Sequence, residues 1–127
     1  MNQNEILSDL SRVIREFNAF KKPILFSSNS SLLACKILGK NNLGPGLIVT
    51  YGAETIEWNN KNYIKYAIDQ GNEHKIKTEK EHCVDSKNGI VTIPGTLKSN
   101  YNLKSILNSF DKGIMAIYNH IRNPNKI

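Results

Sequence analysis

Two apolar stripes at helical spacing, one near each end of the chain, are the clearest pattern in this sequence. The first stripe recurs every three or four positions, which places its members on one side of a helix. Its members are Ile6, Leu10, Val13, Ile14 and Phe17. Asn2 and Glu5 fit a capping box at the start, and Pro23 prevents the helix from continuing. The pattern predicts an amphipathic helix over the first 20 or so residues.

The second stripe runs over about five turns near the carboxyl end of the chain. It consists of Leu103, Ile106, Leu107, Phe110, Ile114, Ile117 and Ile121. Asn102 is a suitable N-cap, and Gly113 is expected to cost about 1 kcal/mol relative to alanine inside a helix. We expect both terminal helices to bury these stripes against a sheet.

Shorter patterns follow the first helix. Ile24 to Phe26 is an apolar run without alternation, which is typical of a strand buried on both faces. After a polar stretch, residues 31–39 fit a short helix that Gly39 ends by taking a positive φ.

The middle of the chain has the features of β structure. Apolar and β-branched residues at 47–50, 55–58, 63–68, 74–84 and 90–93 are separated by turn residues. Asn59 to Asn62 and Asn88-Gly89 are hairpin signals. These segments predict successive antiparallel strands.

Together these elements predict a single α+β domain over residues 1–127. Its central antiparallel sheet has about four to six strands, with the two terminal helices packed on it and a short helix near 31–39. The strand order stays open. An alternative is that Ile24–Phe26, the serine-rich turn and the next helix open a small three-layer α/β fold.

The composition narrows the class of protein. With 39% hydrophobic and 22% charged residues, the chain is expected to fold without a metal or disulfide. No apolar run reaches the roughly 20 residues of a membrane span, and the first residues are not expected to act as a secretory signal. Cys35 and Cys83 are therefore expected to be reduced thiols in a bacterial or phage cytoplasm.

The net charge of +6 favours acidic partners. Lysine supplies most of this charge, and a solvated lysine surface explains it as well as nucleic-acid binding does.

Residues 27–31 (Ser-Ser-Asn-Ser-Ser) lie between a strand and a helix start. Backbone amides and hydroxyls in such a place can hold an anion. The glycines of a phosphate loop and the Gly-x-Ser-x-Gly pattern of hydrolases are both absent. Helix capping, an anion site and a nucleophilic serine are the three interpretations.

The segment 73–82 contains the most reactive side chains. His74 and His82 as acid and base, with Lys80 or Lys77 on the phosphate, would suffice for metal-independent RNA cleavage. On one straight strand the two histidines would lie about 26 Å apart, so this requires a bend. The alternative is an exposed, charged edge strand.

A third candidate is the aromatic cluster of the expected hairpin at 58–66. Trp58, Tyr63 and Tyr66 lie near Lys61 and Lys65. Such a set can anchor a protein partner or stack bases, and it is equally expected in a half-buried strand.

No spacing supports a named reaction, a metal site or a cofactor, and whether the chain is an enzyme stays open. We therefore expect a small cytoplasmic binding protein of the inhibitor, immunity or regulatory type, using the aromatic cluster on an acidic protein partner. The alternatives are a ribonuclease and a non-catalytic nucleic-acid-binding domain. The oligomeric state stays open.

Overall fold

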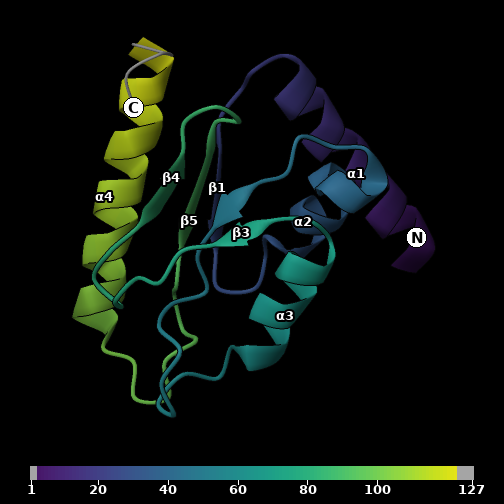
Figure 1. Cartoon of the computed structure of the whole chain (residues 1–127). Helices are drawn as coiled ribbons and strands as arrows, with labels where there is room; N and C mark the ends of the chain where they lie inside the picture. Colours follow the sequence, from purple (N-terminus) through teal and green to yellow (C-terminus); the bar gives the residue numbers. More distant parts are fainter. Residues whose placement is uncertain (1–2, 123–127) are drawn as a thin grey trace.

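The computed structural model describes residues 3–122 of the chain, and Figure 1 shows how its helices and strands are arranged. In chain order the elements are α1 (Gln3–Ala19), β1 (Ile24–Ser27), α2 (Leu32–Leu38), the 3-10 turn η1 (Lys40–Asn42), β2 (Ile48–Val49), α3 (Lys61–Asp69), β3 (Glu73–His74), β4 (Cys83–Asp85), β5 (Ile90–Ile93) and α4 (Leu103–Arg122). The capping box expected at Asn2 lies outside the described residues.

The main sheet is mixed, with the strand order β1-β5-β4. β1 pairs with β5 in parallel, from Ile24 opposite Ile90 to Ser27 opposite Ile93, whereas β4 and β5 form an antiparallel hairpin. β2 and β3 make a separate parallel pair. The expected antiparallel sheet of four to six strands is therefore wrong, because two of the three strand pairs in the described residues are parallel and joined by long crossovers.

The expected hairpin at 59–68 is also wrong, since most of this segment is helix α3. Ile64 and Ala67 are buried three residues apart, which is helical spacing. The side-chain amide of Asn60 donates to the carbonyls of Tyr51 and Ala53 at 2.7 and 2.8 Å, which fixes the start of the helix on the end of β2. The aromatic and β-branched residues here suggested a strand, but their packing against the rest of the protein favours a helix instead.

The remaining local predictions have mixed outcomes. Asn88-Gly89 does close a hairpin, with Gly89 at a φ of 68°. Asn102 does cap α4, since its side-chain oxygen accepts the amides of Lys104 and Ser105. Gly39 does not end α2 through a positive φ, because its φ is −68°.

Side chains connect the two β units. The amide of Ile48 donates to Asp85 Oδ2 and the amide of Thr50 donates to Thr92 Oγ1, each at 2.9 Å. Asp85 also accepts the backbone and side-chain amides of Asn88, at 3.2 and 2.9 Å. The buried carboxylate of Asp85 and the buried hydroxyl of Thr92 thus satisfy the amides of Ile48 and Thr50.

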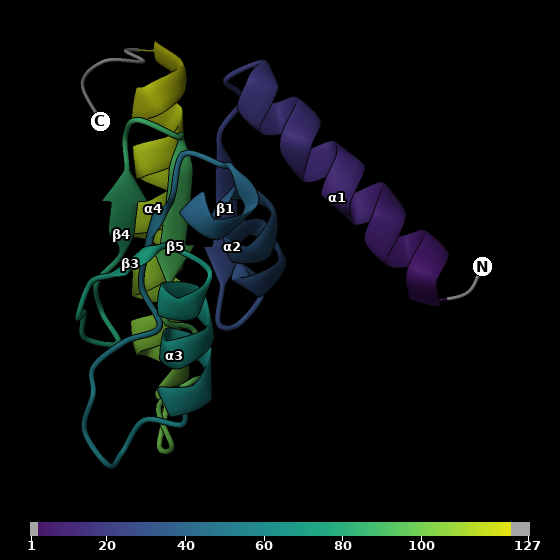
Figure 2. The same ribbon diagram turned by 45° about the vertical axis from the view of Figure 1, so that its right-hand side comes forward.

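The elements form layers around the main sheet (Figure 1). α4 lies on one side of the strands, and α2 and α3 lie on the other. Figure 2 shows that α1 leans away from the body of the molecule, and its main contact is with α2. The expectation that α1 packs on the sheet is therefore wrong: Ile14 is buried, but Leu10 and Phe17 stay 48% and 38% exposed.

α4 does cover the sheet, but it is rotated relative to the expected orientation, so that Ile106 is the one fully buried member of the predicted stripe and Phe110 and Ile117 are half-buried. Small residues face inward, together with Ile106 and His120; they are Ser105, Ser109, Gly113 and Ala116. A Cβ on Gly113 would lie 2.6 Å from Leu25 Cδ1 and 3.5 Å from Ile93 Cγ2. The missing side chain thus lets the helix approach β1 and β5 closely, and most of the apolar stripe remains outside.

This close approach leads to a stability prediction. We expect Gly113→Val to lower the free energy of unfolding by about 1–3 kcal/mol, because the added methyl groups collide with β1 and β5. Urea unfolding measures the change. Asn108→Val, on the exposed side of the same helix, is the matched control and is expected to change stability by about 0.5 kcal/mol or less. Equal effects of the two substitutions would contradict the packing.

Candidate functional site

A strained turn follows β1 at the carboxyl end of the parallel strand pair. The amide of Ser28 makes the last bond of the β1–β5 ladder, to the carbonyl of Ile93 at 3.1 Å. Ser28 then takes a φ of 56°, in the left-handed region that a residue with a side chain occupies at a cost of roughly 1–2 kcal/mol. Such strand–turn–helix corners present a side chain outward at the end of a sheet.

The second half of the site comes from the end of β5, through Pro94-Gly95-Thr96. The amide of Thr96 donates to Ser28 Oγ at 3.0 Å, and the two hydroxyls lie 3.2 Å apart. Gly95 has a φ of 61°, and a Cβ there would collide with the hydroxyls of Ser27 and Ser28. We call residues 27–31 with Gly95 and Thr96 the Ser28 site.

Hydrogen bonds within the turn fix its shape. Ser30 Oγ donates to the carbonyl of Ser27 at 2.7 Å and accepts the amide of Ser27 at 3.0 Å. Ser31 occupies the N-cap position of α2 without a side-chain cap bond; its hydroxyl donates to the Tyr51 hydroxyl at 2.7 Å instead. Side-chain capping therefore does not account for this serine, while the anion and nucleophile interpretations stay predictions.

The surroundings of Ser28 decide what its hydroxyl can do. One lone pair of Oγ is engaged by the amide of Thr96, which leaves its O–H available to donate. Within residues 3–122, Thr96 is the one partner of this hydroxyl, and neither an imidazole nor a carboxylate bonds to it. The geometry fits a hydrogen-bond donor rather than a serine activated by a base.

Below the turn lies a buried cluster of Ser31, Cys35 and Tyr51. The thiol of Cys35 lies 3.5 Å from the Tyr51 hydroxyl. Burial raises the pKa of Cys35 to about 11, against smaller lowering effects of its bonds to Tyr51 and Ser31, and burial likewise raises the pKa of Tyr51. Both groups are neutral at physiological pH, so the cluster supports the turn without supplying a nucleophile.

The two histidines of the RNA-cleavage hypothesis lie in different surroundings. His74 stacks on Tyr51, with ring centroids 6.1 Å apart. His82 lies in a hollow against α4, with Lys112 and Met115 among its neighbours. No contact in the described part of the chain joins the two imidazoles.

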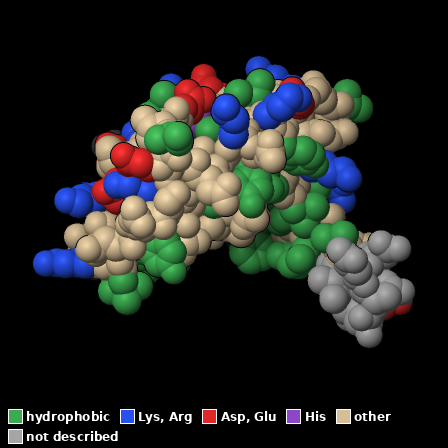
Figure 3. All heavy atoms as spheres, turned by 90° about the horizontal axis from the view of Figure 1, so that it is seen from below, with side chains coloured by type: hydrophobic (Ala, Val, Ile, Leu, Met, Phe, Trp, Pro, Cys, Tyr) green, Lys and Arg blue, Asp and Glu red, His purple; other side chains and the backbone are tan. Residues whose placement is uncertain are grey.

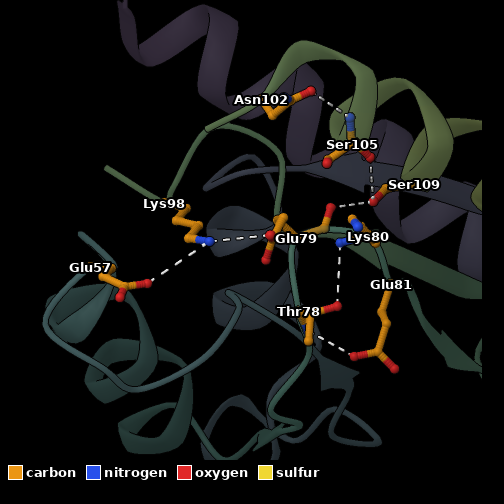
Figure 4. A network of polar contacts seen from close by, with 9 residues as sticks. All are labelled: Glu57, Thr78, Glu79, Lys80, Glu81, Lys98, Asn102, Ser105 and Ser109. Carbon is orange, nitrogen blue, oxygen red and sulfur yellow. Dashed lines mark hydrogen bonds and ion pairs between the residues drawn. The ribbon is translucent and has the colours of Figure 1, made fainter. Parts of the chain in front are cut away.

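Lys80 and its neighbours form a turn that is held on α4 (Figure 4). Ser109 donates to the carbonyl of Glu79 at 2.6 Å, and Lys98 pairs with the Glu79 carboxylate at 3.2 Å. The amide of Lys80 bonds to Thr78 Oγ1 at 3.4 Å, while Lys77 and Lys112 lie near His82. This charged segment is a structural connection between loop and helix, not a continuous edge strand.

The aromatic cluster is not one surface. Trp58 is 8% exposed and lies over Gly52, and the Tyr63 ring lies 6.2 Å from that of Tyr51. Tyr66 is half-buried on α3, whereas Lys61 and Lys65 point outward and Lys65 pairs with Asp69 at 2.9 Å. The aromatic rings therefore belong largely to the interior.

The described residues contain no group of three His, Cys, Asp or Glu side chains placed to hold a metal ion. None of the described helices combines the length and the apolar character that crossing a membrane requires.

Comparison with known proteins gives a relative by sequence. The chain is 34% identical over 93 residues to the mitochondrial ES1 protein of Danio rerio, a match that covers 68% of this chain and 32% of that protein. No protein-family profile matches the sequence. The chain thus spans about a third of the length of this relative.

A solved structure shares the fold. It is an isoprenoid biosynthesis protein with an amidotransferase-like domain from Ehrlichia chaffeensis. The TM-score is 0.75 at 18% sequence identity, and the match covers 90% of this chain and 48% of that chain. The chain therefore shares the fold of about half of that structure, with a mixed sheet between helices.

These findings correct three expectations drawn from the sequence. The relatives are an ES1 protein and an amidotransferase-like protein, so the inhibitor, immunity or regulatory class was wrong, and nothing in them supports a ribonuclease or nucleic-acid-binding domain. The expected cytoplasmic location is contradicted as well, because the relative in Danio rerio is a mitochondrial protein.

Sequence reasoning found one half of the Ser28 site and missed the other. The serine-rich turn between a strand and a helix was visible as a pattern. Gly95 and Thr96 were visible as the end of the last strand, but not as its partners, because parallel pairing across about 65 residues leaves no local signal.

The first test concerns the accessibility of position 28. We expect Ser28→Cys to add one thiol that iodoacetamide alkylates at pH 7, about threefold faster than the thiol of Ser99→Cys, because the Thr96 amide stabilises the thiolate. Cys35 and Cys83 are expected to stay protected in both variants, since burial raises the pKa of each thiol. Mass spectrometry of timed samples measures the rates. Protection of the introduced thiol in Ser28→Cys would contradict an outward-facing turn.

The second test uses the half-buried imidazole of His74. Burial lowers its pKa below the usual value near 6.5, outweighing the nearby Glu54 and a bond to Gly52. The stability that this neutral ring supports is therefore present above pH 6.5 and is lost as the pH falls through its folded-state pKa. We expect unfolding in urea to become easier between pH 7.5 and 5.5, and less so in His74→Gln. The pKa of His82 is also lowered, first by burial and then by the nearby Lys77 and Lys112, so His82 contributes to the pH dependence with the same sign. An unchanged pH dependence in the variant would contradict this.

Proposed function

We propose that this chain carries the ligand-binding turn of an ES1-like, amidotransferase-like protein, and that Ser28 donates a hydrogen bond to an oxygen of a small carboxamide or carboxylate ligand. The backbone conformation of Ser28 is the observation that carries the proposal. A serine held at a φ of 56° has a local cost that a glycine would avoid. Such strain is characteristic of functional positions.

The place of the turn supports a ligand site. In open α/β sheets, ligands bind outside the carboxyl ends of the parallel strands. Ser28 and Thr96 follow the carboxyl ends of the parallel strands β1 and β5. Their hydroxyls, 3.2 Å apart, form a pair of polar groups at this edge.

The chemistry of the hydroxyl pair suggests the class of ligand. Thr96 presents its amide to Ser28 Oγ, so the Ser28 proton points to Thr96 Oγ1 or to an incoming acceptor. A carboxamide or carboxylate oxygen is such an acceptor, and it is the kind of group that the amidotransferase-like description of the solved relative suggests. Without a base in reach among residues 3–122, the proposal assigns binding and orientation to Ser28, not attack on the ligand.

The test is a titration of the chain with L-glutamine, followed by amide chemical shifts in NMR spectra. We expect shifts confined to residues 27–31 and 95–96. We expect Ser28→Ala to weaken binding about fivefold, which corresponds to the loss of one hydrogen bond of about 1 kcal/mol. The control is Ser99→Ala, an exposed serine outside the turn, which is expected to bind as the parent does. Absence of shifts at these residues, or equal affinities of parent and Ser28→Ala, would refute the proposal.

A further inference from the structure

One side of the molecule leaves a sheet edge and two apolar helix faces uncovered. The sheet order β1-β5-β4 puts β1 at an edge, although its residues 24–26 are entirely apolar. All four residues of β1 are only half-buried. Parallel strands in α/β proteins are normally buried on both sides and have neighbours, so this edge is incomplete.

The hydrogen-bond direction identifies the free edge residue by residue. The amide of Ile24 donates to Gly89 and that of Ser28 donates to Ile93, so the even-numbered amides of β1 point to β5. The amides of Leu25 and Ser27 consequently point to the open side. Ser30 Oγ accepts the Ser27 amide, whereas the Leu25 amide faces a side where no described strand lies.

Exposed apolar side chains are found on the helices next to this edge. On α1, the chain segment immediately before β1, they are Leu7, Leu10, Val13 and Phe17. On α4, which contacts β1, they are Leu103, Leu107, Ile114, Met115, Tyr118 and Ile121. The α4 residues are 49–67% exposed, which is unusual for a continuous apolar stripe on a monomer.

The space-filling view agrees with this description. Figure 3 shows hydrophobic side chains gathered in separate groups along the lower margin of the molecule, with a hollow between them. Ile114, Met115, Tyr118 and Ile121 form the outer stripe of α4, and at its end the Arg122 guanidinium lies over the Tyr118 ring, 5.7 Å from the centroid. The surface therefore favours an apolar partner that also offers a strand.

We propose that the β1 edge with the apolar faces of α1 and α4 is the interface for the complementary half of an amidotransferase-like domain. That half adds a strand beside β1 and packs its own elements on the two helix faces. The solved relative supports this occupant, because this chain matches 48% of it and the rest of that protein has no counterpart here. The inference does not depend on the ligand proposed for Ser28.

The experiment pairs the full chain with the part of the Danio rerio ES1 protein that lies outside the 93 matched residues. The two polypeptides are co-expressed, and a second protein joins them covalently, with this chain in place of the matched segment. We expect a 1:1 complex by light scattering. We expect hydrogen exchange of the Leu25 amide to slow by about tenfold or more, in the complex or in the joined protein, relative to the chain alone.

Surface variants distinguish binding at this interface from nonspecific hydrophobic association. Ile114→Asp changes a residue that is 55% exposed, so it is expected to leave unfolding of the chain alone unchanged and to weaken the complex at least tenfold. Leu43→Asp is the matched control, since Leu43 is 99% exposed on the turn after η1 and belongs to neither helix face.

Three results would overturn the inference. One is unchanged exchange of the Leu25 amide in the joined protein. Another is an equal effect of Ile114→Asp and Leu43→Asp on the complex. The third is a homodimer of the chain alone that Ile114→Asp dissociates, which would assign the surface to a second copy.

Discussion

The parallel pairing of β1 with β5 is the interaction on which the rest of this structure depends. It joins residues separated by more than half of the chain. It also places the carboxyl ends of the two strands side by side, so that the Thr96 amide can bond to Ser28 Oγ. The same pairing sets the sheet on which α4 lies. Without it the serine-rich turn would be an ordinary loop, since the strain at Ser28 persists only where surrounding bonds fix the backbone.

α4 shows how packing distance can outweigh apolar area. A helix that turned its large side chains to the sheet would stand farther from β1 and β5, whereas Ser105, Ser109 and Gly113 allow close contact. The contact of Gly113 with Leu25 also ties the helix to the edge strand itself. The large apolar side chains that remain outside favour aggregation of an isolated chain, and they favour binding where another polypeptide covers them.

The sequence alone predicted the elements with strong local signals. The end helices, the Asn88-Gly89 hairpin and the Asn102 cap all depend on neighbours within a few residues. The direction of the sheet, the helix at Lys61–Asp69 and the inward face of α4 depend on contacts across the chain, and a stripe of isoleucines does not reveal whether a sheet or a partner covers it. For the same reason the serine turn was visible and its partner Thr96 was not.

The burial of Trp58 has a practical consequence. It is the single tryptophan of the chain, and its indole lies over Gly52, at a position where any β carbon would collide with the ring. Its fluorescence therefore originates from one defined place, beside a hollow bordered by Glu54, Ile56 and Ile64. The fluorescence of this indole is therefore an intrinsic probe of how closely the segment after β2 packs on the core, and it requires no attached dye.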